Sequence, residues 1–255
     1  MGGALARGLA SGTLIKTSDI YVSNPSTAKL EALKREFPQI NITTNNREAA
    51  MAADMVVLAI KPWKVEEVLD EIKESLDYSR QAVASMVGGL DIWQLSKWLY
   101  KGGGALPATY LIIPNTAIAT MSSMTFIASA RSTAEQDARI LGIFNELGTA
   151  MLVDEELIPA GTSLASCGIA YALRYIRAAM EGGVELGFRA DDAKRIVMQT
   201  LRGAVDILAT TGAHPEAEID RVTTPGGLTI KGLNAMEAEG FSRSVIAGLR
   251  ASTKR

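Results

Sequence analysis

The chain contains only one cysteine and one histidine among its 255 residues. A single cysteine excludes a disulfide framework and favours a reducing, cytoplasmic location. Cys167 and His214 alone cannot build a Cys/His zinc site or a histidine-based nucleophilic triad, so we expect no metal. Any catalysis must therefore depend on backbone amides, hydroxyls, carboxylates, lysines or a bound cofactor.

An excess of one charge and long apolar runs are also missing. The 26 Lys and Arg residues against 28 Asp and Glu give a formal net charge of −2, which argues against nucleic acid or an anionic membrane as the main partner. No apolar run reaches the roughly 18–20 residues of a membrane span. The first ten residues also lack the layout of a secretory signal. The 47% of hydrophobic residues that the chain does have can fill one large core or two medium ones.

Short β-rich segments alternate with amphipathic helical segments over the first two-thirds of the chain. The run MVVLAI at residues 55–60 is apolar throughout, which is typical of a strand buried on both faces of a parallel sheet. Strands separated by helices of this length predict a Rossmann-like, doubly wound parallel sheet over residues 1–154. The expected strands are 19–24, 41–44, 55–60, 82–87, 110–113, 125–128 and 150–153.

The remaining residues, 155–255, are predicted to form an all-α domain. Its first helix, expected at 157–186, is apolar on most sides, with Leu164, Ile169 and Leu173 among its residues. Such a helix must be buried, and a domain of about 100 residues hardly covers it. We therefore expect the helical domain to pack against a second copy of the chain, as a homodimer or a higher homo-oligomer. The other helices are expected at 190–211, 214–222, 227–239 and 242–252.

The first predicted helix begins at Gly2-Gly3 with no strand before it. In a dinucleotide-binding fold the central strand carries the first two glycines of a G-x-G-x-x-G turn, so Gly2 stands where the third glycine would be. The amides at this helix start are candidates for binding a pyrophosphate. We expect the natural protein to be about ten residues longer. For this chain we expect a disturbed sheet and weak cofactor binding.

Several candidate cofactor residues follow the ends of predicted strands, where open α/β sheets bind their ligands. The strand at 19–24 ends without an acidic residue at the expected ribose position, which favours NADP(H) and leaves NAD(H) as the alternative. Lys61 is a candidate partner of a phosphate or of the nicotinamide half, although a solvated lysine before a helix-starting proline is an equally simple interpretation. The candidates are Ser23, Asn24, Ala59, Ile60, Lys61, Pro62, Met86, Val87, Gly88 and Asn115.

The stretch TTPGGLT at residues 223–229 combines hydroxyls, a proline and two glycines just before a predicted helix. The helix-start amides could bind a substrate carboxylate, and Thr229 could hydrogen-bond a nearby nitrogen. An ordinary helix cap would have a similar composition. We interpret His214 as a capping or surface residue and the tryptophans Trp63, Trp93 and Trp98 as packing residues.

With these stretches in order, the whole chain resembles the pyrroline-5-carboxylate reductases of proline biosynthesis. The most specific segment is VTTPGGLTIKGLNAME at residues 222–237, which is similar to the family signature V-[ST]-[ST]-P-G-G-x-T-x-x-[AG]-L. Shorter matches are LAIKP at 58–62 and PNT at 114–116. One departure is Ser166-Cys167-Gly168-Ile169, where the family usually has Gly-Ser-Gly-Pro.

The resemblance implies an NADP-binding Rossmann domain followed by a helical domain that dimerises, with the substrate site completed by the partner chain. It implies a hydride transfer from NADPH to the C=N carbon of 1-pyrroline-5-carboxylate, giving L-proline, with Thr229 as catalytic partner of the ring nitrogen. The residues implied to face the cofactor are Gly2, Asn24, Asn46, Ala59, Ile60, Lys61, Pro62, Met86, Val87 and Gly88. Those implied to face the substrate are Thr224, Gly226, Gly227, Leu228 and Thr229.

Two alternative functions remain at this point. A β-hydroxyacid dehydrogenase-like enzyme has the same layout, but it is expected to place a lysine on the interdomain helix, and residues 162–175 contain none. A non-catalytic helical dimer, derived from an enzyme whose cofactor domain has decayed, fits the missing strand but not the intact 224–229 loop.

Overall fold

The computed structural model describes residues 1–253. Their contacts divide the chain into two compact units, Met1–Ser166 and Cys167–Arg255. The division falls later than the predicted boundary because helix α7 (Ile158–Gly161) packs on the first unit. Ile158 lies in the same apolar core as Phe126, and a Cβ atom on Gly161 would lie only 2.7 Å from the Phe126 ring. The helix therefore belongs to the α/β unit.

The first unit contains seven strands, one at each predicted position. The strands are β1 (Tyr21–Ser23), β2 (Asn41–Thr43), β3 (Met55–Leu58), β4 (Ala82–Ser85), β5 (Thr109–Ile113), β6 (Ser123–Ala130) and β7 (Gly148–Leu152). They form a five-stranded sheet in the order β3-β4-β5-β6-β7 and a separate pair, β1-β2. Within residues 1–253, β1 is thus paired only with β2, and β3 only with β4. This division agrees with the expected disturbance of the sheet.

The predicted Rossmann-like parallel sheet is confirmed, with one antiparallel pair, β5 and β6. The other pairs are parallel. A parallel connection requires a crossover of a dozen or more residues, and only residues 114–122 separate these two strands. The sheet remains predominantly parallel and Rossmann-like.

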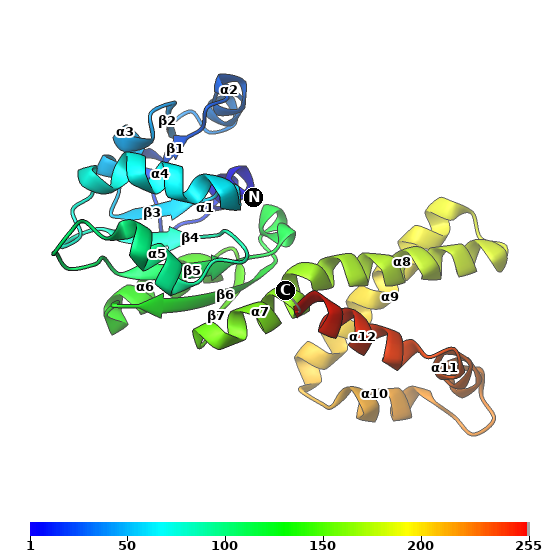
Figure 1. The fold of residues 1–255 in the computed structure, drawn as a ribbon. Coiled ribbons are helices and arrows are strands. Elements are labelled where there is room, and N and C mark those ends of the chain that lie inside the picture. The colour runs from blue at the N-terminus through cyan, green and yellow to red at the C-terminus, as the bar shows by residue number, and fades with distance from the viewer. Residues whose placement is uncertain (254–255) are drawn as a thin grey trace. The chain divides into compact units, whose positions relative to one another are not determined.

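Helices cover both faces of the five-stranded sheet (Figure 1). Successive residues of β5 point to opposite faces of the sheet. Leu111 packs with helices α4 and α5 on one face, and Ile112 packs with α1 and α6 on the other. A third apolar cluster joins α1 and α2 to the segments around β1 and β2. The helices of this unit are α1 (Gly2–Ser11), α2 (Thr27–Glu36), α3 (Asn46–Ala52), α4 (Val65–Ile72), α5 (Ile92–Leu99), α6 (Ala134–Asn145) and α7. Short 3-10 turns are η1 (Thr17–Asp19), η2 (Pro62–Lys64), η3 (Lys73–Ser75), η4 (Thr116–Thr120) and η5 (Glu155–Leu157).

The second unit is helical, as predicted, and the expected long helix at 157–186 runs without a break to Glu185, but its turns differ in type along its length. It consists of η5, α7, a π-helical turn η6 (Thr162–Cys167) and α8 (Gly168–Glu185). Four further helices follow: α9 (Ala190–Thr211), α10 (Pro215–Val222), α11 (Leu228–Ala238) and α12 (Phe241–Thr253).

Helices α8–α12 bury very little of their own apolar surface. Ala193 is their only buried residue in the described chain. Leu186 and Leu228 are 83% and 87% exposed. This agrees with the prediction that the helices need a second copy for cover.

Two of the three tryptophans do not pack as predicted. Trp63 and Trp93 are 75% and 70% exposed, and only Trp98 packs against the core. Each exposed indole lies beside a lysine of its own segment, since Lys61 and Lys97 are 6.0 and 5.7 Å from the two ring centroids. No helix within residues 1–253 is long and apolar enough to cross a bilayer.

Candidate cofactor and substrate site

The N-terminus of α1 lies against the carboxyl end of β3. A Cβ atom on Gly2 would lie 3.0 Å from the Cβ atom of Ala59, so glycine allows the helix start to approach the strand end closely. No side chain caps this helix. Its first amides, at Gly2 and Gly3, find no acceptor among the described residues. Free amides and a positive dipole end fit a pyrophosphate.

The carboxyl ends of β3 and β4 lie side by side because the pairing of the two strands continues past their last residues. The Met86 amide donates to the Leu58 carbonyl at 3.0 Å, which extends the pairing one residue beyond the strands. Val87 is buried, whereas Gly88 is exposed and has open space on its side-chain side. The two strand ends therefore present backbone on the side where α1 begins.

The exposed segment that follows β3 begins a 3-10 turn. Lys61 stands at the N-cap of η2 and Pro62 is its first residue, as a proline at a helix start should be. The Lys61 ammonium lies beside the Trp63 ring and is free of any ion pair among the described residues. Both interpretations of Lys61, phosphate partner and solvated lysine, are consistent with this position.

Two predicted cofactor residues, Ser23 and Asn46, are brought together at the ends of β1 and β2. The Ser23 hydroxyl donates to Asn46 Oδ1 at 2.8 Å, and Asn46 Nδ2 donates to Glu71 Oε2 at 2.8 Å. Asn24 Oδ1 accepts from the Ser26 amide at 2.9 Å. Sequence reasoning missed Glu71, which reaches this point from α4 and carries no local motif. Its carboxylate brings negative charge to the position predicted to read the ribose.

Asn115 lies directly after β5 and is only 5% exposed. Its Oδ1 accepts from the Ala117 amide at 3.0 Å, and its Nδ2 donates to the Ala165 carbonyl at 3.4 Å. Both ends of the side-chain amide are therefore bound within the protein.

The predicted substrate loop is a tight turn followed by a helix start. The Gly227 amide donates to the Thr224 carbonyl at 2.9 Å, with Pro225 and Gly226 in between. Gly226 has φ +71°, and this arrangement of proline, then glycine at positive φ, is a type II turn. At Gly227 a Cβ atom would lie 2.5 Å from Thr224 Oγ1, so a side chain there would collide.

Gly227 is the N-cap of α11 and offers no side chain to its first amides. Leu228 and Thr229 are the first two helical residues, and both are exposed. The turn is thus followed by uncapped backbone amides and by an exposed threonine in the first turn of α11.

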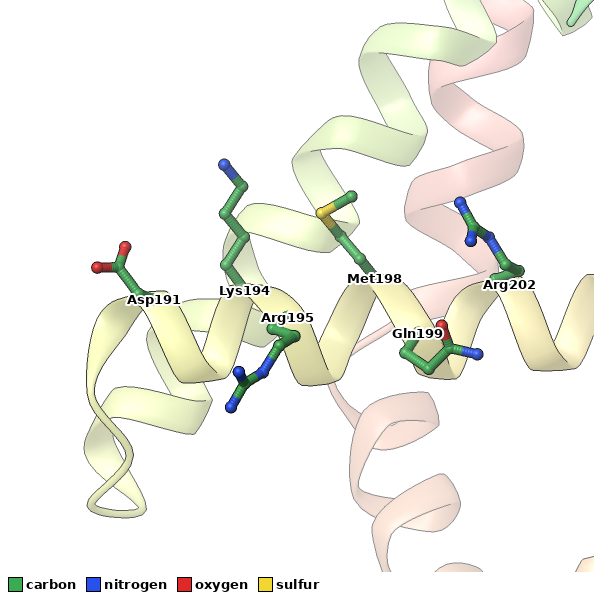
Figure 2. A pocket seen from close by; sticks show the side chains of 6 residues that line it. All are labelled: Asp191, Lys194, Arg195, Met198, Gln199 and Arg202. Atoms are coloured by element: carbon green, nitrogen blue, oxygen red, sulfur yellow. The ribbon is translucent and has the colours of Figure 1, made fainter.

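A hollow of about 540 Å³ lies elsewhere in the helical unit, along one face of α9. Figure 2 shows that the six side chains lining it all come from this single helix. None of them is a predicted site residue. Because a single helix lines the hollow on one side only, it does not enclose a ligand. We interpret it as part of the exposed surface of the helical unit. The lining residues are Asp191, Lys194, Arg195, Met198, Gln199 and Arg202.

The groups whose pKa is shifted from its ordinary value are not among the predicted cofactor or substrate residues. Burial raises the pKa of Tyr78 and of Tyr110 to about 12. The pKa of Glu146 is lowered because its carboxylate accepts from the Thr13 hydroxyl and from the Leu14 and Thr13 amides. His214 is the N-cap of α10, where its Nδ1 accepts from the Glu216 amide at 3.3 Å, which confirms the capping interpretation.

Two family models match the chain. Residues 155–255 match pyrroline-5-carboxylate reductase dimerisation, and residues 1–87 match NADP oxidoreductase, coenzyme F420-dependent. The first model covers the helical domain and the second covers the segments around α1, β1 and β3.

Similar proteins extend the match over the whole chain. Pyrroline-5-carboxylate reductase 1 of Dictyostelium discoideum is 38% identical over 100% of this chain, which spans 47% of that longer protein. Pyrroline-5-carboxylate reductase 2 of the same organism is 36% identical, with 100% of this chain and 88% of the relative covered.

A crystal structure of Plasmodium falciparum pyrroline carboxylate reductase with NADP bound has the same fold. It superposes with a TM-score of 0.87 at 26% identity and covers 99% of this chain and 92% of that one. Identity above 30% over nearly a full-length relative, a matching dimerisation model and a shared fold agree with one another. The chain belongs to the pyrroline-5-carboxylate reductase family.

Proposed function

We propose that the chain reduces 1-pyrroline-5-carboxylate to L-proline with a hydride from NADPH. The observation that carries this proposal is the type II turn at Thr224–Gly227, which opens onto the uncapped start of α11. This geometry suits a small anionic substrate whose ring must be held in one orientation.

The substrate carboxylate would be bound by the free amides at the start of α11, where the positive end of the helix dipole favours an anion. The Thr229 hydroxyl would accept a hydrogen bond from the protonated ring nitrogen. An iminium is a good hydride acceptor, so positioning matters more than a strong acid. This requirement suits a chain whose single histidine is occupied in a helix cap.

A bound nicotinamide cofactor would supply the hydride to the ring carbon of the C=N bond and leave as its oxidised form. The α1 amides would hold its pyrophosphate. The backbone at Ala59–Pro62 and Met86–Gly88 would lie along it, and Ser23, Asn24 and Asn46 would lie at its ribose. We propose NADP(H) as the preferred form, since β1 ends without an acidic residue. Glu71, bound to Asn46, is the feature that speaks for NAD(H).

The helical domain is proposed to form the homodimer, or the core of a higher homo-oligomer, and the partner chain is proposed to complete the substrate site. The exposed apolar side chains of α8–α12 and the single-walled hollow on α9 support this arrangement. Sedimentation at several protein concentrations tests it, and a monomer throughout would contradict it. The single free cysteine suits the cytoplasm, which we propose as the location.

The test of the activity is loss of NADPH absorbance on addition of 1-pyrroline-5-carboxylate, with formation of L-proline measured in the same samples. NADPH alone gives the background, and NADH in place of NADPH measures the cofactor preference. Proline formation that matches the NADPH consumed is the expected result. A folded oligomer that forms no proline with either cofactor would favour the non-catalytic helical dimer instead.

A further inference from the structure

Asn115 joins three segments at the carboxyl end of β5. Its side chain accepts from Ala117 at the start of η4 and donates to Ala165 in the π-helical turn. Its own amide donates to Ser123 Oγ at 3.1 Å, at the first residue of β6. A buried amide side chain with partners on both ends has a single favourable orientation. Asn115 is thus bound to its surroundings in three directions.

A second bond runs between the same two segments in the opposite direction. The Ser166 hydroxyl donates to the Pro114 carbonyl at 3.0 Å. Pro114 and Asn115 are consecutive, and so are Ala165 and Ser166. We call these two bonds, Asn115 to Ala165 and Ser166 to Pro114, the β5–π clasp. All four residues lie within the first unit.

The π-helical turn occupies a special place in the chain. Before it, α7 packs on the core of the α/β unit; after it, α8 begins the helical unit that carries residues 224–229. Single π-turns within helices are rare and occur frequently at functional sites. The clasp therefore holds the last residues of the α/β unit before the chain enters the helical unit.

On its other side the clasp reaches the helix proposed to hold the pyrophosphate. Asn115 is the N-cap of η4, and η4 packs on α1, where a Cβ atom on Gly8 would lie 3.7 Å from the Ile118 carbonyl oxygen. One buried side chain thus connects the segment packed on the cofactor helix to the segment leading into the helical unit.

We propose that Asn115 is a positioning residue for the proposed hydride transfer, on which this inference rests. The β5–π clasp fixes the π-helical turn at the carboxyl end of β5, the edge of the sheet where the cofactor is proposed to bind. The nicotinamide carbon and the ring carbon must meet at close range, and a small misplacement costs a large factor in rate. The clasp acts on kcat and leaves NADPH affinity nearly unchanged, since the Asn115 amide is bound to protein atoms.

The most selective variant is Asn115→Asp, which has the same shape. It keeps the oxygen that accepts from Ala117 but places a second oxygen against the Ala165 carbonyl. Burial favours the neutral form of a carboxylic acid, and only that form can donate to Ala165. Activity of Asn115→Asp relative to the unaltered chain should therefore rise as the pH falls. Ser166→Ala removes the other bond, and Ser166→Thr restores a hydroxyl.

The matched control is Ser122→Ala, because the exposed Ser122 hydroxyl donates only to Thr120 in its own turn, at 3.1 Å. At neutral pH we expect kcat to fall about tenfold in Asn115→Asp and about fivefold in Ser166→Ala, as for one lost hydrogen bond each. The Kd of NADPH should change less than about twofold. Hydrogen exchange should quicken at residues 162–167 in both variants and not in the control.

Different outcomes separate the two proposals. If the unaltered chain forms no proline, the proposed function fails, and the catalytic part of the positioning role fails with it. Unchanged hydrogen exchange in the variants would, separately, show that the two clasp bonds do not hold the π-helical turn. If the unaltered chain is active, weaker NADPH binding with unchanged kcat would make Asn115 a cofactor contact instead. Faster exchange with unchanged kcat would leave the clasp without a role in catalysis. If Asn115→Asp does not fold, the test uses Ser166→Ala and Ser166→Thr. A lower kcat in Ser166→Ala that is restored in Ser166→Thr supports the proposal, and an unchanged kcat in Ser166→Ala contradicts it.

Discussion

The turn at residues 224–227 offers the sharpest test of the proposed substrate site. Gly226 has φ +71°, a region that costs a residue with a side chain about 1–2 kcal/mol. The turn is exposed and closed by one backbone hydrogen bond of 2.9 Å, which contributes about 0.5–1.5 kcal/mol net. The strain energy of alanine at this φ is at least as large as the free energy that the hydrogen bond contributes. We therefore expect the turn in Gly226→Ala to open and not to keep the strained conformation.

Relaxing the turn redirects the start of α11 and with it the amides proposed to bind the carboxylate. A loss of about 1.4 kcal/mol in substrate binding corresponds to a tenfold change, so we expect the KM for 1-pyrroline-5-carboxylate to rise about tenfold or more. NADPH affinity should stay the same. Gly227→Ala should have a stronger effect, because its Cβ atom would also meet the Thr224 carbonyl at 3.0 Å.

Gly212→Ala is the matched control for lost stability. Gly212 has φ +62° and open space around it, and it ends α9. Alanine there suffers a similar backbone strain of about 1–2 kcal/mol but leaves residues 224–229 unchanged. Urea unfolding followed by circular dichroism compares the midpoints, and steady-state kinetics gives KM and kcat. Equal KM values in Gly226→Ala and Gly212→Ala would refute the assignment of the turn to the substrate site.

Three other measurements follow from the same geometry. Thr229→Val should lower kcat about 10- to 100-fold, as expected for a lost hydrogen bond to a charged nitrogen, while NADPH binding stays the same; unchanged turnover would remove Thr229 from the mechanism. The folded-state pKa of Glu146 is lowered by the Thr13 hydroxyl and the Leu14 and Thr13 amides, so its stabilisation is present above its unfolded pKa and is lost as the pH falls through the folded value. Urea midpoints should therefore be lower in Glu146→Gln than in the unaltered chain at neutral pH and converge with them in acid; a constant difference would contradict this. Calorimetric titration should show weak NADPH binding, because the β1-β2 pair, which carries proposed ribose contacts, is separate from the main sheet. Tight binding would show that the division of the sheet does not lower cofactor affinity.

Much of the local structure could be predicted because local rules act within a few residues. The predicted helix at 190–211 coincides with α9, and α5 begins with a capping box between Asp91 and Gln94, a signal contained within four residues. The apolar runs at β3 and β5 marked strands, and β5 is buried along its whole length. The prediction that 55–60 is buried on both faces is wrong on one face, because β3, at the edge of the five-stranded sheet, buries Val56 and Leu58 but leaves Met55 and Val57 half-buried. His214 could be predicted as a cap because it precedes Pro215 at a helix start.

The errors came from features that depend on distant partners. The predicted helix widens into a π-helical turn where Asn115 bonds to Ala165 and Ser166 bonds to Pro114, and no local signal in residues 162–167 predicts this change. Trp63 was expected to be a packing residue, yet its place after Pro62, just beyond the end of β3, leaves it exposed. The β5-β6 pair is antiparallel because the connection between the two strands is short. The sequence did not show that these two strands are neighbours in the sheet, so it did not predict their direction.

The candidate site divides in the same way. Its residue types and order could be predicted from sequence, because a strand end, a glycine pair before a helix and the 222–237 segment are each contiguous. The links between Ser23, Asn46 and Glu71, and between Asn115 and Ala165, could not, since they join residues that are far apart in the chain.

By itself, the sequence determined the family, the order of strands and helices, and the need of the helical domain for a second copy. These are set by hydrophobic periodicity, turn residues and composition, which act over a few residues at a time. Only the tertiary structure decided that the sheet is divided in two, that α7 belongs to the α/β unit, and that the amide of Asn115 is bound to the protein's own backbone. Those outcomes depend on which buried polar groups find partners once the chain has folded, and that competition is settled between segments distant in sequence.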